Sequence, residues 1–405
     1  MFVLGLIIFL HILIYAILGN CVLFNINTGI TLIAWIFSIY LAIRYKKNIY
    51  LLIPVLLLFI NEFMYVNFNL DAFDGPSRTK LFYDITTTYF IKNEGKNTNL
   101  TEGIYLKDLR DNNSLMTEEE SKQLSPEKGN TNKYEKFFLF LNIEPSEYKG
   151  LKILDMGCGN GDFIKYCNSL GMKASGMTIS KEQVLHLKNQ GLDVHEGSYR
   201  ELQPQFIGKY DIVTFWGSIE HITQAYPCSK SGEEKAEEVL INIMNHLKKY
   251  YREESKYKMI FTTVLHMNRD ICKDSVNCYI IERAYGGWYF YDRPKETISD
   301  KMEYTGFKKL KQDDFTYHYY MATKIDPHHF GCPSYPNFYN MMALFFGIFI
   351  NPNLIAMSIY GLRGEWMWQF DNKLHLFDEP CNNCTFEYDR SKRPTTLLWS
   401  LNKLE

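Results

Sequence analysis

The sequence predicts an α/β fold, a doubly wound sheet preceded by N-terminal transmembrane helices. Apolar runs alternate with amphipathic stretches from Leu151 onward, a glycine-rich turn follows the first of these runs, and residues 1–70 are strongly apolar. At 405 residues the chain is long enough for more than one domain. We divide it into a membrane anchor (residues 1–70) and an N-terminal cap segment (71–135), followed by an α/β core (136–330) and a helical and aromatic extension (331–405).

Composition argues against a nucleic-acid partner and against a metal site. Lys and Arg total 44 against 46 Asp and Glu, so no basic field attracts a phosphate backbone. The 9 cysteines are scattered, which is typical of a reduced compartment. Cys381 and Cys384 form a lone CxxC without a second pair or nearby histidines. We therefore predict two ordinary thiols there rather than a metal centre.

Two apolar runs open the chain. Residues 1–24 contain no Asp, Glu, Lys or Arg, and residues 26–43 form a second run that ends at Arg44, Lys46 and Lys47. Each run approaches the roughly 20 residues that a helix needs to cross the hydrocarbon core of a bilayer. A cleaved signal peptide would need a basic start and a small-residue cleavage site, and neither is present. The sequence therefore predicts an integral membrane protein.

The number of spans decides on which side the rest of the chain lies. The positive-inside rule places the basic cluster after the second run in the cytosol. A third stretch, residues 49–59, is shorter and contains Pro54. If it also spans, everything after Asn61 lies outside; if it lies along the inner surface, the rest of the chain is cytosolic. We favour the two-span hairpin, with the later domains on the cytosolic face and the membrane as a partner.

The middle of the chain predicts strands that alternate with helices. The predicted strands cover residues 152–156, 173–177, 193–195, 211–215 and 259–265, and the predicted helices cover residues 162–170, 181–190 and 233–250. This alternation is typical of a parallel sheet with helices on both faces. Residues 93–132 are rich in Asn, Thr, Glu and Lys and are predicted to be a mobile segment that leads into this core.

A glycine-rich turn follows the first predicted strand. Asp155 ends the strand, and Gly157, Gly159 and Gly161 occupy alternate positions at the start of the next helix. Glycines there let a ligand approach the backbone at a helix N-terminus. A dinucleotide site would have GxGxxG and an acid roughly 20 residues later, but the second strand ends at Thr178 without one. With the fourth-strand run at residues 210–213, the turn resembles the Rossmann-like core of methyltransferases that use S-adenosylmethionine (SAM).

Further motifs narrow this resemblance. Residues 176–183 have the pattern G-x-T-x-S-x-x-Q, and residues 216–221 end in a Glu-His pair. Later elements lie at residues 286–289, 305–307 and 318–320. Weaker matches lie upstream, at residues 83–84 and 103–105. Together they resemble the cyclopropane-fatty-acid synthases and their amine-methylating relatives, such as the coclaurine N-methyltransferases. The resemblance covers roughly residues 82–330. It implies an enzyme with SAM as its cofactor and a small-molecule or lipid substrate.

The resemblance also assigns residues to the cofactor. Its cofactor-binding set is Asp155, Gly157, Gly159 and Gly161 by the methionine half of SAM, Thr178 and Gln183 by the ribose, and Ser198 and Tyr199 by the adenine. Tyr199 has an alternative interpretation as a core aromatic residue. The segment at 71–135 would cap the substrate.

The same resemblance suggests catalytic residues, with two departures. The synthases hold a bicarbonate with a Cys, the Glu-His pair, a fifth-strand His and a late Tyr. In this chain the catalytic set is Glu220, His221, His266 and either Tyr319 or Tyr320, and we choose Tyr320. Gly103 stands where the Cys is expected, and His266 lies two residues beyond Val264, on the same strand face. Bicarbonate is therefore a doubtful second ligand.

Three functions follow as hypotheses. The first is direct methyl transfer to a lipid-like or amine acceptor at a membrane, with His221 as the base and Glu220 orienting it. The second is a cyclopropane synthase with a rearranged base. The third is a SAM-binding membrane scaffold without catalysis, which the losses at Gly103 and Val264 would permit.

Overall fold

The computed structural model describes residues 37–52, 80, 83–84, 87, 101–223, 230–268, 289–291, 297–325 and 395–405. Residues 37–45 form a helical segment, and the 3-10 helix η1 (Asn48–Leu51) follows it. The predicted first span, the start of the second and residues 53–59 of the third stretch lie outside the described residues. Within the described ranges no helix is both long and apolar enough to cross a bilayer.

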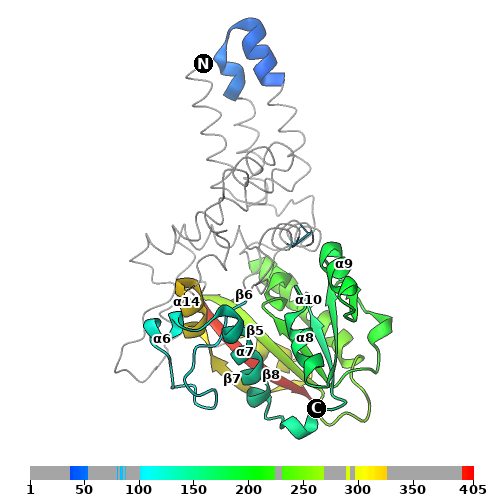
Figure 1. Ribbon diagram of the computed structural model, residues 1–405. Coiled ribbons are helices and arrows are strands. Elements are labelled where there is room, and N and C mark those ends of the chain that lie inside the picture. Colours follow the sequence, from blue (N-terminus) through cyan, green and yellow to red (C-terminus); the bar gives the residue numbers. More distant parts are fainter. Residues whose placement is uncertain are drawn as a thin grey trace.

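The sheet contains the strands that the sequence predicts, together with three more. Its strands are β1 (Lys152–Met156), β2 (Lys173–Thr178), β3 (Val194–Glu196), β4 (Ile212–Trp216), β5 (Met259–Asn268), β6 (Tyr289–Tyr291), β7 (Phe307–Asp314) and β8 (Thr395–Leu404). Their order is β3-β2-β1-β4-β5-β8-β7, and β6 pairs with the end of β5 (Figure 1). The strand order reverses between β1 and β4, as in a doubly wound sheet.

Strand β8 corrects two predictions. It pairs antiparallel with both β5 and β7, so the sheet is mixed rather than purely parallel. It also comes from residues 395–404, within the part predicted as a C-terminal extension. The core therefore includes the end of the chain, because β8 fills the gap between β5 and β7.

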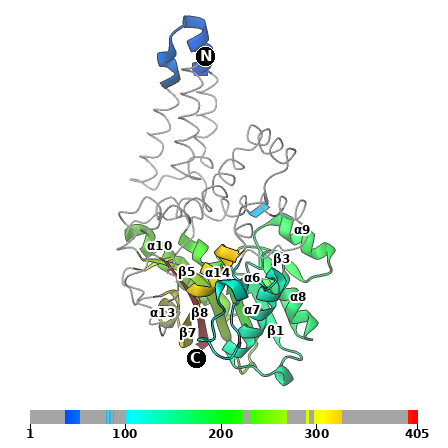
Figure 2. The same ribbon diagram turned by 60° about the vertical axis from the view of Figure 1, so that its left-hand side comes forward.

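Alternating side chains divide the core into two layers. On one face, Ile153, Ile212 and Phe261 pack against α7 (Pro126–Leu141), α8 (Asp162–Ser169) and α9 (Lys181–Asn189). The residues that follow these in the chain point to the other face. Leu154 and Val213, for example, pack against α10 (Lys230–Lys248) and α13 (Ile298–Glu303). Figure 2 shows α7 and α8 in front of β1. Helices on both faces confirm the predicted arrangement, and the central strands β1 and β4 are accordingly buried on both sides.

The segment before the core is ordered where the structure describes it, contrary to the predicted mobility of residues 93–132. Helix α6 (Glu118–Lys122) begins with a capping box between Thr117 and Glu120. Helix α7 begins at Ser125, whose side chain accepts from Lys128 N, and it ends at Asn142 in the left-handed conformation. Helix α6 packs beside α14 (Thr316–Ile325). The polar composition of this segment reflects the exposed sides of α6 and α7. Apolar residues such as Ile104 are fully buried.

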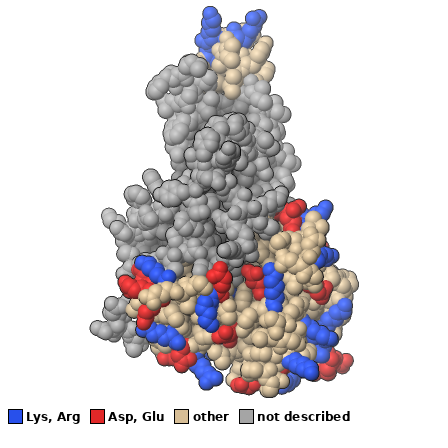
Figure 3. Space-filling view, in the orientation of Figure 1, with Lys and Arg blue, Asp and Glu red and all other residues tan. Residues whose placement is uncertain are grey.

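The segment at residues 37–52 exposes both aromatic and basic side chains. Phe37 is 58% exposed, Tyr40 59% and Ile43 71%. Figure 3 shows blue side chains gathered at this end of the molecule, where Arg44, Lys46 and Lys47 lie, and Figures 1 and 2 both place it apart from the sheet.

Trp399, on β8, lies at the centre of the aromatic core. It is 0% exposed and stacks on Phe315 with ring centroids 4.2 Å apart. It meets Trp216, Phe261 and Phe140 edge-on. We predict that Trp399→Ala lowers the free energy of unfolding by about 3–5 kcal/mol, the usual range for removing a buried large aromatic ring.

Urea unfolding followed by circular dichroism measures this loss. The control is Leu139→Ala on α7, whose side chain is 42% exposed and which should change stability by no more than about 0.5 kcal/mol. A Trp399→Ala protein as stable as the control would mean that β8 is not part of the cooperative core.

Candidate active site

The glycine-rich turn lies where β1 meets α8, at the carboxyl ends of the parallel strands. Gly157 N and Cys158 N both donate to Met177 O on β2, at 2.7 and 3.0 Å. These bonds hold the turn against the neighbouring strand. Ligands bind at this edge of doubly wound sheets, at the point where the strand order reverses.

The three glycines of the turn are required for different reasons. All three have positive φ, between +52° and +84°. A Cβ at Gly157 would lie 2.5 Å from Ser218 Cβ, and a Cβ at Gly161 would lie 2.7 Å from Leu187 Cδ2. A Cβ at Gly159 would meet nothing within 4 Å. Gly157 and Gly161 are therefore needed for packing, whereas Gly159 borders the open space that a ligand could enter.

Asp155 lies beneath the turn rather than in the open space. Its side chain is 2% exposed and accepts a hydrogen bond from Thr214 Oγ1 at 2.9 Å. Burial raises the pKa of Asp155 to about 7, against the lowering effects of Thr214 and the Lys133 ammonium. The structure thus gives Asp155 a role in joining β1 to β4 and in the charge of the site.

Thr178 and Gln183 bind each other at the end of β2. Thr178 Oγ1 donates to Gln183 Oε1 at 2.6 Å, and both side chains are buried. Ser180 begins helix α9 by accepting from Gln183 N, and its hydroxyl donates to Asp84 at 2.6 Å. Asp84 therefore joins the N-terminal segment to the edge of the site.

Ser198 and Tyr199 hold the loop after β3. Ser198 Oγ accepts from Arg200 N, and Tyr199 Oη donates to Ser218 O at 2.9 Å. The Tyr199 ring packs edge-on against Phe215 of the core, at 5.7 Å. These contacts favour the alternative interpretation of Tyr199 as a core aromatic residue, and they place it next to the carboxyl end of β4.

Glu220 and His221 lie on the 3-10 helix η4 (Ile219–Thr223), immediately after β4. Glu220 is 5% exposed, and burial raises its pKa to about 8, although Leu265 N–H donates to its carboxylate. Tyr83 Oη lies 3.0 Å from His221 Nε2. Burial, assisted by the charge of Arg200, lowers the pKa of His221 to about 4. At neutral pH His221 is therefore a neutral imidazole whose Nε2 can accept a hydrogen bond, and its low pKa makes it a weaker base than an exposed histidine.

A second carboxyl group lies near Glu220. Glu102 is 2% exposed, accepts from Trp399 Nε1 at 3.1 Å, and has a pKa raised by burial, which the nearby Lys133 opposes. Its charge also raises the pKa of Glu220. Sequence reasoning missed Glu102, although it stands next to Gly103, at the motif position where a pocket residue was expected. Buried acids with raised pKa values cluster at functional sites.

Tyr319, the alternative to Tyr320, lies by these carboxyl groups. It is 6% exposed, and its pKa is raised by burial and then by the charges of Glu102 and Glu220. Tyr320 lies in α14, but its side chain is outside the described part of the structure.

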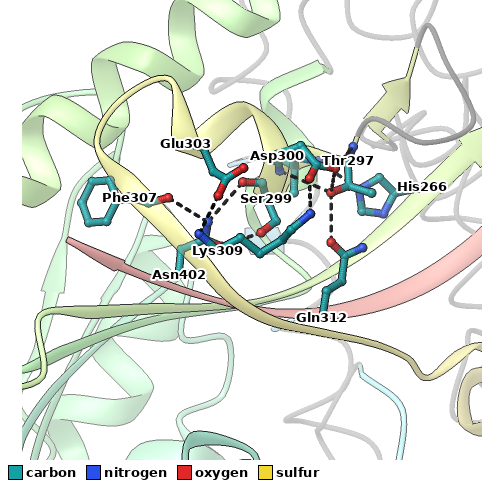
Figure 4. A network of polar contacts seen from close by, with 10 residues as sticks. His266, Thr297, Ser299, Asp300, Glu303, Phe307, Lys309, Gln312 and Asn402 are labelled. Atoms are coloured by element: carbon teal, nitrogen blue, oxygen red, sulfur yellow. Dashed lines mark hydrogen bonds and ion pairs between the residues drawn. The ribbon is translucent and has the colours of Figure 1, made fainter. Parts of the chain in front are cut away.

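His266 has a different place from the predicted one. Its Nδ1–H donates to Val264 O at 3.1 Å, and its Nε2 accepts from Ile298 N at 3.3 Å, at the start of α13. The ring is fully buried, beside the network that Thr297 forms with Asp300 and Gln312 (Figure 4). The prediction that His266 shares a strand face with Val264 is confirmed, but that face packs against α13. Both ring nitrogens bind main-chain groups, so the structure gives His266 a structural role instead of a catalytic one.

Gly103 is glycine because the backbone there touches α7. Ile104 N donates to Gly129 O at 3.0 Å, and a Cβ at Gly103 would lie 3.2 Å from Gly129 Cα. A cysteine at this position would press against main chain, which cannot rotate away as a side chain can. The cysteine that helps to hold bicarbonate in the synthases therefore does not fit at position 103. The carboxyl group of Glu102 stands next to this position in the chain.

Comparison with known proteins finds similarity over the middle of the chain. Residues 122–300 match a family model described as a methyltransferase domain. A ubiquinone biosynthesis O-methyltransferase of Aromatoleum aromaticum is 33% identical over 79 residues, 18% of this chain and 34% of the relative. A probable fatty acid methyltransferase of Mycobacterium tuberculosis is 31% identical over 114 residues, 26% of this chain and 25% of the relative. These matches support the predicted methyltransferase domain, and they span about a third or less of each relative.

A solved structure agrees on the fold. The cyclase SpnF superposes with a TM-score of 0.51 at 12% identity, covering 82% of this chain and 96% of that one. The predicted Rossmann-like fold is thereby confirmed. Because that protein is named as a cyclase, the shared fold does not by itself decide the reaction.

The space beside Gly159 gives a direct test of the turn. We predict that Gly159→Val lowers the affinity for SAM by at least about tenfold, because its side chain would occupy the ligand's space. Gly191→Val is the matched control, since Gly191 also has a positive φ, +77°, and open space around it, at the end of α9. Calorimetry measures affinity, and circular dichroism monitors folding. Equal SAM affinity in the two variants would remove the turn from the binding site.

Proposed function

We propose that this chain transfers the methyl group of SAM to a nitrogen or oxygen atom of a lipid-like or amine acceptor. The observation that carries the proposal is the neutral His221, beside the buried Glu220, at the carboxyl end of β4. That end is next to the glycine turn, because a Cβ on Gly157 would touch Ser218, two residues before Glu220.

The residues present fit SAM. Gly159 leaves room beside the backbone, as a cofactor that presses against the turn would need. SAM supplies a methyl group already activated by a positively charged sulfur. The chain therefore has to align the acceptor, shield it from water and remove one proton. Burial raises the pKa values of Glu102 and Glu220, and a positively charged ligand beside them would favour their ionised forms.

His221 would accept the proton of the acceptor. The phenol of Tyr83 and the neutral imidazole lie 3.0 Å apart, so the Tyr83 hydroxyl marks the direction from which Nε2 accepts a hydrogen. An acceptor N–H or O–H in that direction would take the place of the phenol. With a pKa near 4, His221 stays in its base form at every pH above about 5.

Cyclopropanation has less support. It would require a base that removes a proton from a carbocation, and the residues that hold such a base in the synthases are Gly103 and Val264 in this chain. Gly103 contacts α7 and Val264 lies in the core. The similarity to a probable fatty acid methyltransferase favours an acceptor with a lipid chain, which direct methyl transfer also accommodates. A SAM-binding scaffold without catalysis is suggested by the losses at Gly103 and Val264, but Gly103 has a packing cause.

The base can be tested with His221→Ala. We predict that S-adenosylhomocysteine affinity stays within a few-fold, whereas the methylation rate falls by about 10²–10⁴, the cost of losing a general base. Raising the pH should partly rescue the variant, because solvent then deprotonates the acceptor. Cyclopropanation would show little rescue, since its deprotonation follows methyl transfer.

Membrane lipid extract with methyl-labelled SAM serves as substrate, and mass spectrometry measures the product. The control is His186→Ala on α9, whose ring contacts Gln190 on the same helix and should not affect the rate. A His221→Ala enzyme that works at the wild-type rate would refute the role of His221 as the base.

We also propose that the chain is an integral membrane protein with its methyltransferase domain on the cytosolic face. The apolar runs at residues 1–24 and 26–43 support this proposal, as do the exposed Phe37, Tyr40 and Ile43 next to the basic cluster. Aromatic and basic side chains gather at membrane–water interfaces.

Alkaline carbonate washing of membranes that contain the full chain tests the anchor. The protein should stay in the pellet, and protease added outside sealed, right-side-out vesicles should leave the methyltransferase domain intact. Inverted vesicles are the control, in which the domain should be cleaved. Release by carbonate would contradict the anchor, and cleavage in right-side-out vesicles would contradict the two-span hairpin.

A further inference from the structure

Lys133 is a buried lysine on the inner side of helix α7. Its side chain is 0% exposed, and its Nζ donates to Thr101 Oγ1 at 2.6 Å. The ammonium also lies 5.1 Å from the ring centre of Tyr134 and 5.5 Å from that of Trp216. Burying a lysine is unfavourable unless charges or hydrogen bonds compensate it, so this position needs an explanation.

The contact with Trp216, the last residue of β4, places the Lys133 ammonium near the carboxyl ends of the strands, where the glycine turn lies. Burial lowers the pKa of Lys133 to about 8, while Glu102, Asp162 and Asp155 raise it. Asp155 stands just before the three glycines, and Asp162 is the first residue of α8, just after them. The ammonium is thus close to both ends of the turn. It has three N–H donors, and Thr101 takes one.

We propose that Lys133 binds the carboxylate of the methionine half of SAM, an inference that rests on the proposed function. An ammonium forms its strongest hydrogen bonds with anionic groups, and the carboxylate is the anionic group of SAM. The free N–H groups at the start of α8 favour negative charge at the same place. Lys133 would therefore fix the end of the cofactor away from the sulfur, which sets where the methyl group lies.

A purely structural role is the alternative, in which Lys133 only balances Asp155 and Glu102. Lys136 offers the matched comparison on the same helix. It is 4% exposed, and its Nζ donates to Leu109 O at 2.5 Å. Its charged neighbours are Lys311, Asp313, Asp108 and Asp111 rather than the acids at the turn.

The two roles differ in which ligand loses affinity. Calorimetry on the full chain would compare S-adenosylhomocysteine with its decarboxylated analogue, for the wild type, Lys133→Met and Lys136→Met. We expect Lys133→Met to weaken S-adenosylhomocysteine by about ten- to a hundredfold, as for the loss of a charged hydrogen bond, and to leave the analogue within about twofold. Lys136→Met should leave both affinities unchanged. Equal losses for the two ligands, or no loss for either, would overturn the proposal.

Two further measurements keep the outcome clear. Lys133→Gln and Lys133→Arg serve if Lys133→Met does not fold: Gln should lose the preference for the carboxylate, and Arg should keep part of it. The wild type must itself prefer S-adenosylhomocysteine over the decarboxylated analogue, and equal affinities would overturn the inference without any variant. A wild type that binds neither ligand would instead overturn the proposed function, so the two failures are distinguishable.

Discussion

The hydrogen bond from the Trp399 indole to Glu102 joins the end of the chain to the segment that precedes the methyltransferase core. Trp399 stands on β8, between β5 and β7, and Glu102 is next to Thr101, which binds Lys133. One buried contact thus holds in place both a carboxyl group and the partner of the buried lysine. If β8 did not pair between β5 and β7, the polar groups around the glycine turn would lose their supporting layer.

The site keeps several ionisable groups out of water at once, and this is favourable only if they compensate one another. Burial by itself raises the pKa values of Asp155, Glu102 and Glu220 and lowers that of Lys133. The single ammonium among these acids offsets part of the cost, since opposite charges stabilise each other strongly where solvent is excluded. A ligand that brings positive charge on sulfur and on an amino group would compensate the remaining acids. The arrangement of charge therefore suits SAM better than a simple anion such as bicarbonate.

The sequence predicts the part of the fold in which neighbours in the chain are neighbours in space. Strand β1 has the predicted bounds, because an apolar run between turn residues can form little else. Strand β8 was missed because its partners, β5 and β7, lie far away along the chain. Lys133 gave a weaker signal: it stands four residues before Phe137, on the side of the helix that carries the buried aromatic residues. A charged residue in that register is unusual, and it could have marked the site.

His266 shows where pattern reasoning reaches its limit. Strand alternation correctly gives it the same face as Val264, but alternation does not tell which layer covers that face. Helix α13 covers it, and the main chain takes up both ring nitrogens. Gly103 shows a similar limit. The sequence alone indicates that a motif cysteine is missing there, whereas the structure shows that a side chain at this position would press against Gly129. Both departures from the synthase pattern thus have a packing cause. The proposed chemistry uses instead the carboxyl end of β4, where Glu220 and His221 follow the strand.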